Sequence, residues 1–85
     1  MITINYFSAT WCGPCKMFAP IVEVVSQEEN VPVVKIDVEQ SQDMAKAYDV
    51  RSVPTLVLMK NGTQVARHTG IMGKAQLQQF INAHK

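Results

Sequence analysis

The chain has 85 residues, of which 47% are hydrophobic and 18% are charged, and its formal net charge is +1. A chain of this length suffices for one domain over residues 1–85 and is too short for two. Its basic residues form no block, and its apolar runs are too short to cross a bilayer. The sequence therefore predicts neither nucleic-acid binding through the phosphate backbone nor a membrane protein.

The first predicted element is a strand over residues 2–7, in which side chains alternate between two faces. The aliphatic residues and Tyr6 share one face, whereas Thr3 and Asn5 make the other face more polar. We therefore expect thinner cover on the polar face. The N-terminal residues 1–6 show neither the basic segment nor the cleavage site of a signal peptide. If the natural protein begins at Met1, we expect it to stay in the cytoplasm.

The only two cysteines, Cys12 and Cys15, follow this strand after a short loop. An amphipathic helix pattern runs from Cys15 to Glu29, with Pro20 as an expected kink. The pair therefore lies at a helix N-terminus, where unpaired backbone N–H groups stabilise a thiolate. We expect Cys15 to lie inside the helix and to be the more buried of the two. In a reducing cytoplasm, such a pair is more often catalytic than structural.

The spacing of the cysteines has two other interpretations, half of a zinc site or two inert thiols. A zinc site needs two further ligands, and only His68 and His84 remain as histidines. Their spacing is not that of a zinc finger, and His84 is next to the C-terminus. We therefore predict no metal.

The next two elements are a strand and a short helix. Residues 31–38 are rich in β-branched side chains and predict a buried second strand. Ser41 is a plausible N-cap of a helix that continues to Tyr48. Asp49 is then expected to take a left-handed backbone conformation, which Asp tolerates better than most residues.

A hairpin and a helix complete the chain. Strands are predicted over residues 55–60 and 63–69, and the Asn61-Gly62 dipeptide between them is a strong signal for a tight turn. Gly73 begins the last helix. The resulting order, β-α-β-α-β-β-α, predicts an α/β fold with a mixed four-stranded sheet and helices on both faces.

The residues around the cysteines suit thiol–disulfide exchange. Cys12 is expected to attack a substrate disulfide, and Cys15, held nearby, is expected to displace the reduced substrate. Pro14 rigidifies the intervening pair, and Gly13 leaves room for a large partner. Trp11 offers an apolar surface beside the sulfur.

The stretch from Trp11 to Lys16 is identical to the active-site sequence of thioredoxins, and the resemblance covers nearly the whole chain. Further matches are Pro20 in the active-site helix, Val53-Pro54-Thr55 as the cis-proline loop, Lys60-Asn61-Gly62 in the hairpin, and Gly70 near the active-site surface. The resemblance implies a thioredoxin-like fold. It also implies that substrates bind at Trp11, Val53, Pro54 and Gly70.

Tyr6 occupies the position where thioredoxins usually carry a buried Asp that relays a proton for the second cysteine. Because the pKa of a free tyrosine is about 10, Tyr6 is a poor base at neutral pH. We expect a core residue whose hydroxyl finds one partner, the alternative being that it orients a water molecule for Cys15. Lys35 matches the lysine that neighbours the usual Asp. It either modulates a cysteine pKa or extends to solvent.

The second departure from the family is that the usual first strand and first helix have no counterpart here. The compact length is similar to that of glutaredoxins. We expect a monomer, although an exposed sheet edge leaves dimerisation open.

The resemblance implies a thiol-disulfide oxidoreductase that reduces protein disulfides without a bound cofactor. It implies electrons from NADPH through a thioredoxin reductase, and clients such as ribonucleotide reductase, peroxiredoxins and methionine sulfoxide reductases. One alternative is a glutaredoxin-like, glutathione-dependent reductase. The other is a redox-independent binding subunit of a larger complex.

Overall fold

A computed structural model describes residues 1–85. The elements in chain order are β1 (Ile2–Ser8), α1 (Gly13–Glu29), β2 (Val33–Asp37), α2 (Gln42–Ala47), β3 (Thr55–Lys60), β4 (Thr63–Thr69) and α3 (Lys74–Asn82). This order agrees with the predicted one. No helix is long and apolar enough to span a bilayer.

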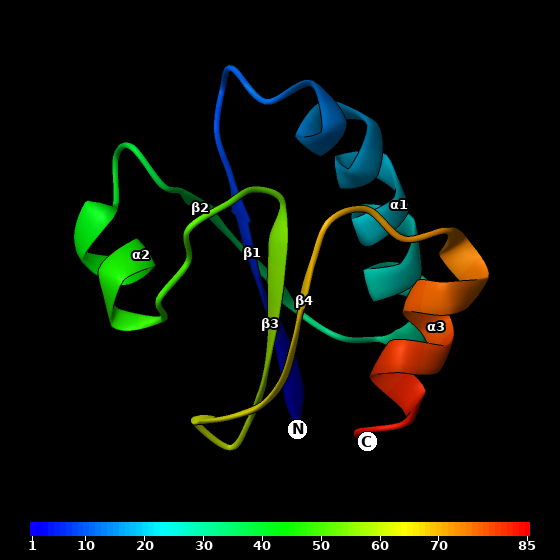
Figure 1. Ribbon diagram of the computed structural model, residues 1–85. Helices are drawn as coiled ribbons and strands as arrows, with labels where there is room; N and C mark the ends of the chain where they lie inside the picture. Colours follow the sequence, from blue (N-terminus) through cyan, green and yellow to red (C-terminus); the bar gives the residue numbers. More distant parts are fainter.

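The four strands form one mixed sheet in the order β2-β1-β3-β4. β1 is parallel to β2, to which α1 connects it, and antiparallel to β3, which pairs antiparallel with β4. Figure 1 shows α1 and α3 on one face of the sheet and α2 on the other. The predicted α/β architecture with helices on both faces is therefore confirmed.

The larger core lies between the sheet and the helices α1 and α3. It contains Phe18, Val22 and Val25 of α1 together with Leu77 and Ile81 of α3, all essentially inaccessible to solvent. These positions recur every three or four residues, so each helix turns one apolar stripe toward the strands. Burial of this stripe orients α1 and thereby its first turn, where the cysteines lie.

The opposite face of the sheet has a smaller core. Phe7, Ile36 and Val57 form a cluster there, covered in part by Met44 and Tyr48 from the region of α2. Because α2 has only six residues, it covers this face incompletely. The expectation of thinner cover on the polar face of β1 holds only at Thr3, because Asn5 on the same face is 7% exposed.

The second strand differs from its prediction. β2 is shorter than expected and lies at the edge of the sheet, with Val34 47% exposed and Lys35 also exposed. The β-branched composition indicated a strand correctly, but it does not determine which strands flank it. The prediction of a buried strand was therefore wrong.

The local turn signals were largely correct. Asn61 and Gly62 have φ values of 54° and 84°, the left-handed pair that a two-residue hairpin turn requires. Asp49 also has a positive φ, of 53°. Ser41 precedes α2 as predicted, but its side chain makes no capping hydrogen bond.

Candidate active site

Cys12 and Cys15 are joined by a disulfide, with their Cα atoms 5.3 Å apart. Cys12 is the N-cap of α1, and its Sγ accepts a hydrogen bond of 3.1 Å from the backbone N–H of Cys15. Pro14 lies in the first turn, where its missing N–H leaves no helical bond unmade. The N-terminus of a 17-residue helix and a donated N–H therefore both favour a negative charge on Cys12 Sγ.

Exposure does not distinguish the two cysteines. Cys15 lies inside α1 as expected and is 3% exposed, whereas Cys12 is 4% exposed, so the expected order of burial holds only by a negligible margin. Both sulfurs pack with Ala9 against Val38 and Val53. The bridge brings the two side chains into one small cluster, and the N-cap hydrogen bond, rather than burial, makes them unequal.

Tyr6 lies directly beneath the active-site helix. Its hydroxyl donates a hydrogen bond of 2.9 Å to the carbonyl oxygen of Cys15, and its ring meets Phe18 edge-on at 5.9 Å. Only 2% of Tyr6 is exposed, and this burial raises the pKa of its hydroxyl above the ordinary value of 10.0. The expectation of a core tyrosine with one hydroxyl partner is confirmed. At neutral pH the hydroxyl is a donor and accepts no proton.

Lys35 lies on the exposed edge strand, and its ammonium group forms an ion pair with the carboxylate of Glu23 on α1. A surface depression reaches from Lys35 to Cys15 and is also lined by Tyr6 and Lys16. No carboxylate lines this depression. The structure therefore places Lys35 and Cys15 along one depression, and it pairs the lysine with Glu23, which the sequence analysis did not single out.

The loop before β3 lies beside the cysteines. The Val53–Pro54 peptide bond is cis, as the sequence predicted, and Val53 contacts the cysteine cluster. The backbone N–H of Gly70 donates to the carbonyl of Pro54 at 2.9 Å, which places Gly70 next to the loop. Gly70 has a φ of 100°, a conformation that side-chain-bearing residues rarely adopt.

Trp11 is 67% exposed and forms one wall of an apolar groove beside the disulfide. The groove is lined by Trp11, Val38, Val50, Arg51, Ser52 and Val53. Sequence reasoning identified Trp11 and Val53 but missed Val38 and Val50, which carry no local signal apart from being apolar. No group of three or more His, Cys, Asp or Glu side chains is placed to hold a metal ion.

The fold and the bridged cysteine pair define a thiol-disulfide oxidoreductase. The thioredoxin family model matches residues 2–83. The chain is 45% identical over 85 residues to a thioredoxin from Bacillus subtilis, covering 98% of this chain and 82% of that protein. The chain therefore belongs to the thioredoxin family.

Two further relatives bear on structure and partners. The structure of a mutant thioredoxin from Halobacterium salinarum superposes with a TM-score of 0.93 at 41% identity, covering 98% of this chain and 74% of that one. A bifunctional thioredoxin reductase/thioredoxin from Mycobacterium leprae is 45% identical over 73 residues, which is 84% of this chain and 16% of that protein.

Proposed function

We propose that this protein is a general protein-disulfide reductase in which Cys12 is the nucleophile and Cys15 the resolving thiol. The observation that carries the assignment is the N-cap position of Cys12, whose Sγ accepts the N–H of Cys15. A thiolate formed there is stabilised by the helix and is the form of cysteine that attacks disulfides. This hydrogen bond reaches the sulfur of Cys12 and not that of Cys15, so the Cys15 sulfur receives no such support.

The reaction proceeds in two exchanges. The Cys12 thiolate attacks one sulfur of the client disulfide, and the other client sulfur leaves as a thiolate and takes up a proton. Cys15 then loses its proton and attacks Cys12 Sγ, which forms the internal disulfide and releases the second client thiolate. The client gains two electrons and the dithiol loses the same two. Proximity makes the second exchange intramolecular and fast.

Client recognition is assigned to the surface around the cysteines. Trp11, Val53, Pro54 and Gly70 surround the apolar groove or the loop beside it. Gly13 supports this assignment, because a Cβ added there would meet no atom within 4 Å. The surface next to Cys12 is therefore open at Gly13, where a client segment can lie. Tyr6 and Lys35 support the site by holding the Cys15 backbone and by placing a cation near it.

The electron source is proposed to be an NADPH-dependent thioredoxin reductase. The bifunctional Mycobacterium leprae relative, which joins a thioredoxin reductase and a thioredoxin, supports this choice. We propose ribonucleotide reductase, peroxiredoxins and methionine sulfoxide reductases as clients, in the cytoplasm, with residues 1–85 acting as one monomeric domain. The glutathione-dependent alternative receives no support from the active-site sequence.

The test is reduction of insulin disulfides with NADPH and a thioredoxin reductase, run beside a glutathione-coupled assay. We expect turnover only with the reductase and none for Cys12→Ser. Cys15→Ser should instead accumulate a mixed disulfide with the client, because nothing displaces it. Turnover only with glutathione would overturn the proposed electron source. Silence in both assays would replace the reductase proposal with a scaffold role.

A further inference from the structure

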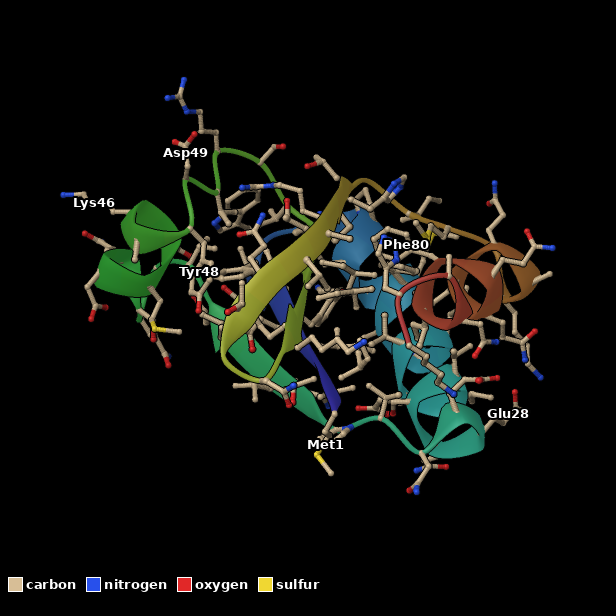
Figure 2. The ribbon with its side chains drawn as sticks, turned by 90° about the horizontal axis from the view of Figure 1, so that it is seen from below. Met1, Glu28, Lys46, Tyr48, Asp49 and Phe80 are labelled. Atoms are coloured by element: carbon tan, nitrogen blue, oxygen red, sulfur yellow. A yellow bond between two sulfur atoms is a disulfide. The ribbon has the colours of Figure 1, made fainter.

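Arg67 connects β4 to the end of α2. Its Nη1 donates to the carbonyl of Tyr48 at 2.7 Å and its Nη2 donates to the carbonyl of Asp49 at 3.2 Å. Figure 2 shows Tyr48 and Asp49 where the chain leaves α2. The last carbonyls of a helix lack intrahelical partners and carry partial negative charge. Tyr48 is the C-cap residue of α2 and Asp49 follows it, so the guanidinium group of Arg67 ties the chain just beyond the helix end to β4.

Few other interactions fix α2. Only Ala45 of this helix is buried, and the Ser41 side chain makes no capping bond. Tyr48 packs its ring 5.8 Å from that of Phe7, which anchors the helix end from one side. Arg67 supplies the polar anchor for the same end.

Residues 50–54, which we call the client loop, lie between Tyr48 and Thr55, and their far end is held by the start of β3 and the residue after β4. Thr55 Oγ1 donates to the carbonyl of Ser52 at 2.7 Å, and Pro54 accepts the N–H of Gly70. Arg67 itself pairs with Val57 of β3 in the sheet ladder. Both ends of the loop are therefore attached to the β3–β4 hairpin. The residues between them include Val50 and Val53 of the groove.

We propose that Arg67 is a positioning residue that sets the geometry of the client loop. This inference rests on the proposed function, since it assumes that the loop receives a protein client. Arg67 acts through the carbonyls of Tyr48 and Asp49 and touches neither cysteine. Its loss therefore changes how a protein client is held, while the chemistry at Cys12 stays the same.

The test compares Arg67→Gln and Arg67→Lys with Gln64→Ala, an exposed residue of the same strand whose side chain makes no hydrogen bond in the structure. Arg67→Gln can keep at most one of the two hydrogen bonds of Arg67. With insulin as client and dithiothreitol as reductant, we expect the loss of one bond to raise KM about three- to tenfold. We expect kcat to stay within about twofold. Arg67→Lys keeps the charge but not the forked guanidinium group, so its KM should lie between those of the unchanged protein and Arg67→Gln.

Two further measurements separate positioning from a general structural role. The rate of Arg67→Gln with hydroxyethyl disulfide, a substrate too small to span the loop, should equal that of the unchanged protein. Amide exchange should accelerate at Asp49 and Val50, whose N–H groups now bond to the carbonyls of Lys46 and Ala45 at 3.1 and 2.8 Å. If Arg67→Gln fails to fold, Arg67→Lys decides by the same measurements.

An unchanged KM for insulin in Arg67→Gln would overturn the inference, as would an equal slowing with both disulfides. A raised KM with unchanged exchange at the loop would also overturn it, because Arg67 would then contact the client itself. If the unchanged protein does not reduce insulin, the proposed function itself fails, and the positioning role of Arg67 fails with it.

Discussion

The face of the sheet that carries α1 and α3 buries a cluster of 12 side chains, whereas the face that carries α2 buries a cluster of three. Cys12 is the N-cap of α1 and Cys15 lies in its first turn, so the helix that carries the cysteine pair is held by the larger cluster. The proposed client loop, residues 50–54, follows α2 and packs against two clusters of only three buried side chains each. The loop therefore depends on individual hydrogen bonds, from Arg67 and Thr55, where α1 depends on packing.

This division separates the two tasks of the protein. Stabilising a thiolate requires that the N–H groups of the helix end stay fixed around the sulfur. A large core that holds the helix provides this rigidity. Accepting different clients is compatible with a loop held by a few polar contacts, because such segments open locally at lower free energy than the core. The two faces should therefore respond differently to substitution.

The largest expected effect comes from truncating matched helix residues on the two faces. Leu77→Ala on α3 removes a side chain that is 0% exposed, and we expect it to lower the free energy of unfolding by about 2–5 kcal/mol. Met44→Ala on α2 removes a half-buried side chain of similar size and should cost about 1 kcal/mol. Urea denaturation of both variants measures the difference. Equal losses would contradict the unequal cores.

The second effect concerns Thr55, whose hydroxyl holds the far end of the proposed client loop. Thr55→Val keeps the shape of a side chain that is 1% exposed but removes its hydrogen bonds to the Ser52 carbonyl and to Thr69 Oγ1. We expect a loss of about 1 kcal/mol in unfolding free energy and a raised KM for insulin. Thr55→Ser, which keeps the hydroxyl, is the control for KM. A KM that changes with loss of the methyl group and not with loss of the hydroxyl would refute the role of the Thr55 hydroxyl.

A third effect tests the link between β1 and the active-site helix. Tyr6→Phe removes the hydrogen bond to the Cys15 carbonyl and should cost about 0.5–1.5 kcal/mol at neutral pH. Burial raises the pKa of Tyr6 above 10.0, so the folded state holds this proton more tightly than the unfolded state does. Stability from this source is present below pH 10 and is lost as the pH rises further.

The difference between the unchanged protein and Tyr6→Phe should therefore shrink above pH 10, which urea denaturation at two pH values measures. A difference that is independent of pH would show that the pKa of Tyr6 is not raised. Slower resolution of the mixed disulfide in Tyr6→Phe would instead favour the alternative that the hydroxyl orients a water molecule.

The smallest effect is expected at the edge strand. Lys35 and Glu23 form an ion pair between side chains that are 60% and 48% exposed, so solvent screens their attraction. We expect Glu23→Gln to change the free energy of unfolding by no more than about 0.5 kcal/mol. Denaturation at low and high salt provides the measurement. A larger change that persists at high salt would assign this pair a structural role.

Local patterns in the sequence determined much of this protein. The order of the elements, the Asn61-Gly62 turn, the positive φ of Asp49 and the position of Cys12 at a helix start were all predicted correctly. Each depends on residues within a few positions of one another, so the physical cause is present in the local sequence. The cis bond before Pro54 was predicted differently, from the resemblance of Val53-Pro54-Thr55 to a family loop and not from local physical chemistry.

Only the tertiary structure decided the features that depend on pairing across the chain. The edge position of β2 follows from strand order, and the donors to the carbonyls of Cys15 and Tyr48 come from Tyr6 and Arg67 on other elements. Nothing in the neighbourhood of Arg67 indicates a bond to a residue 19 positions away. The equal burial of the two cysteines likewise depends on Val38 and Val53, which the fold brings to them. Such contacts exist only once the sheet has aligned its strands, because alignment determines which side chains can reach one another.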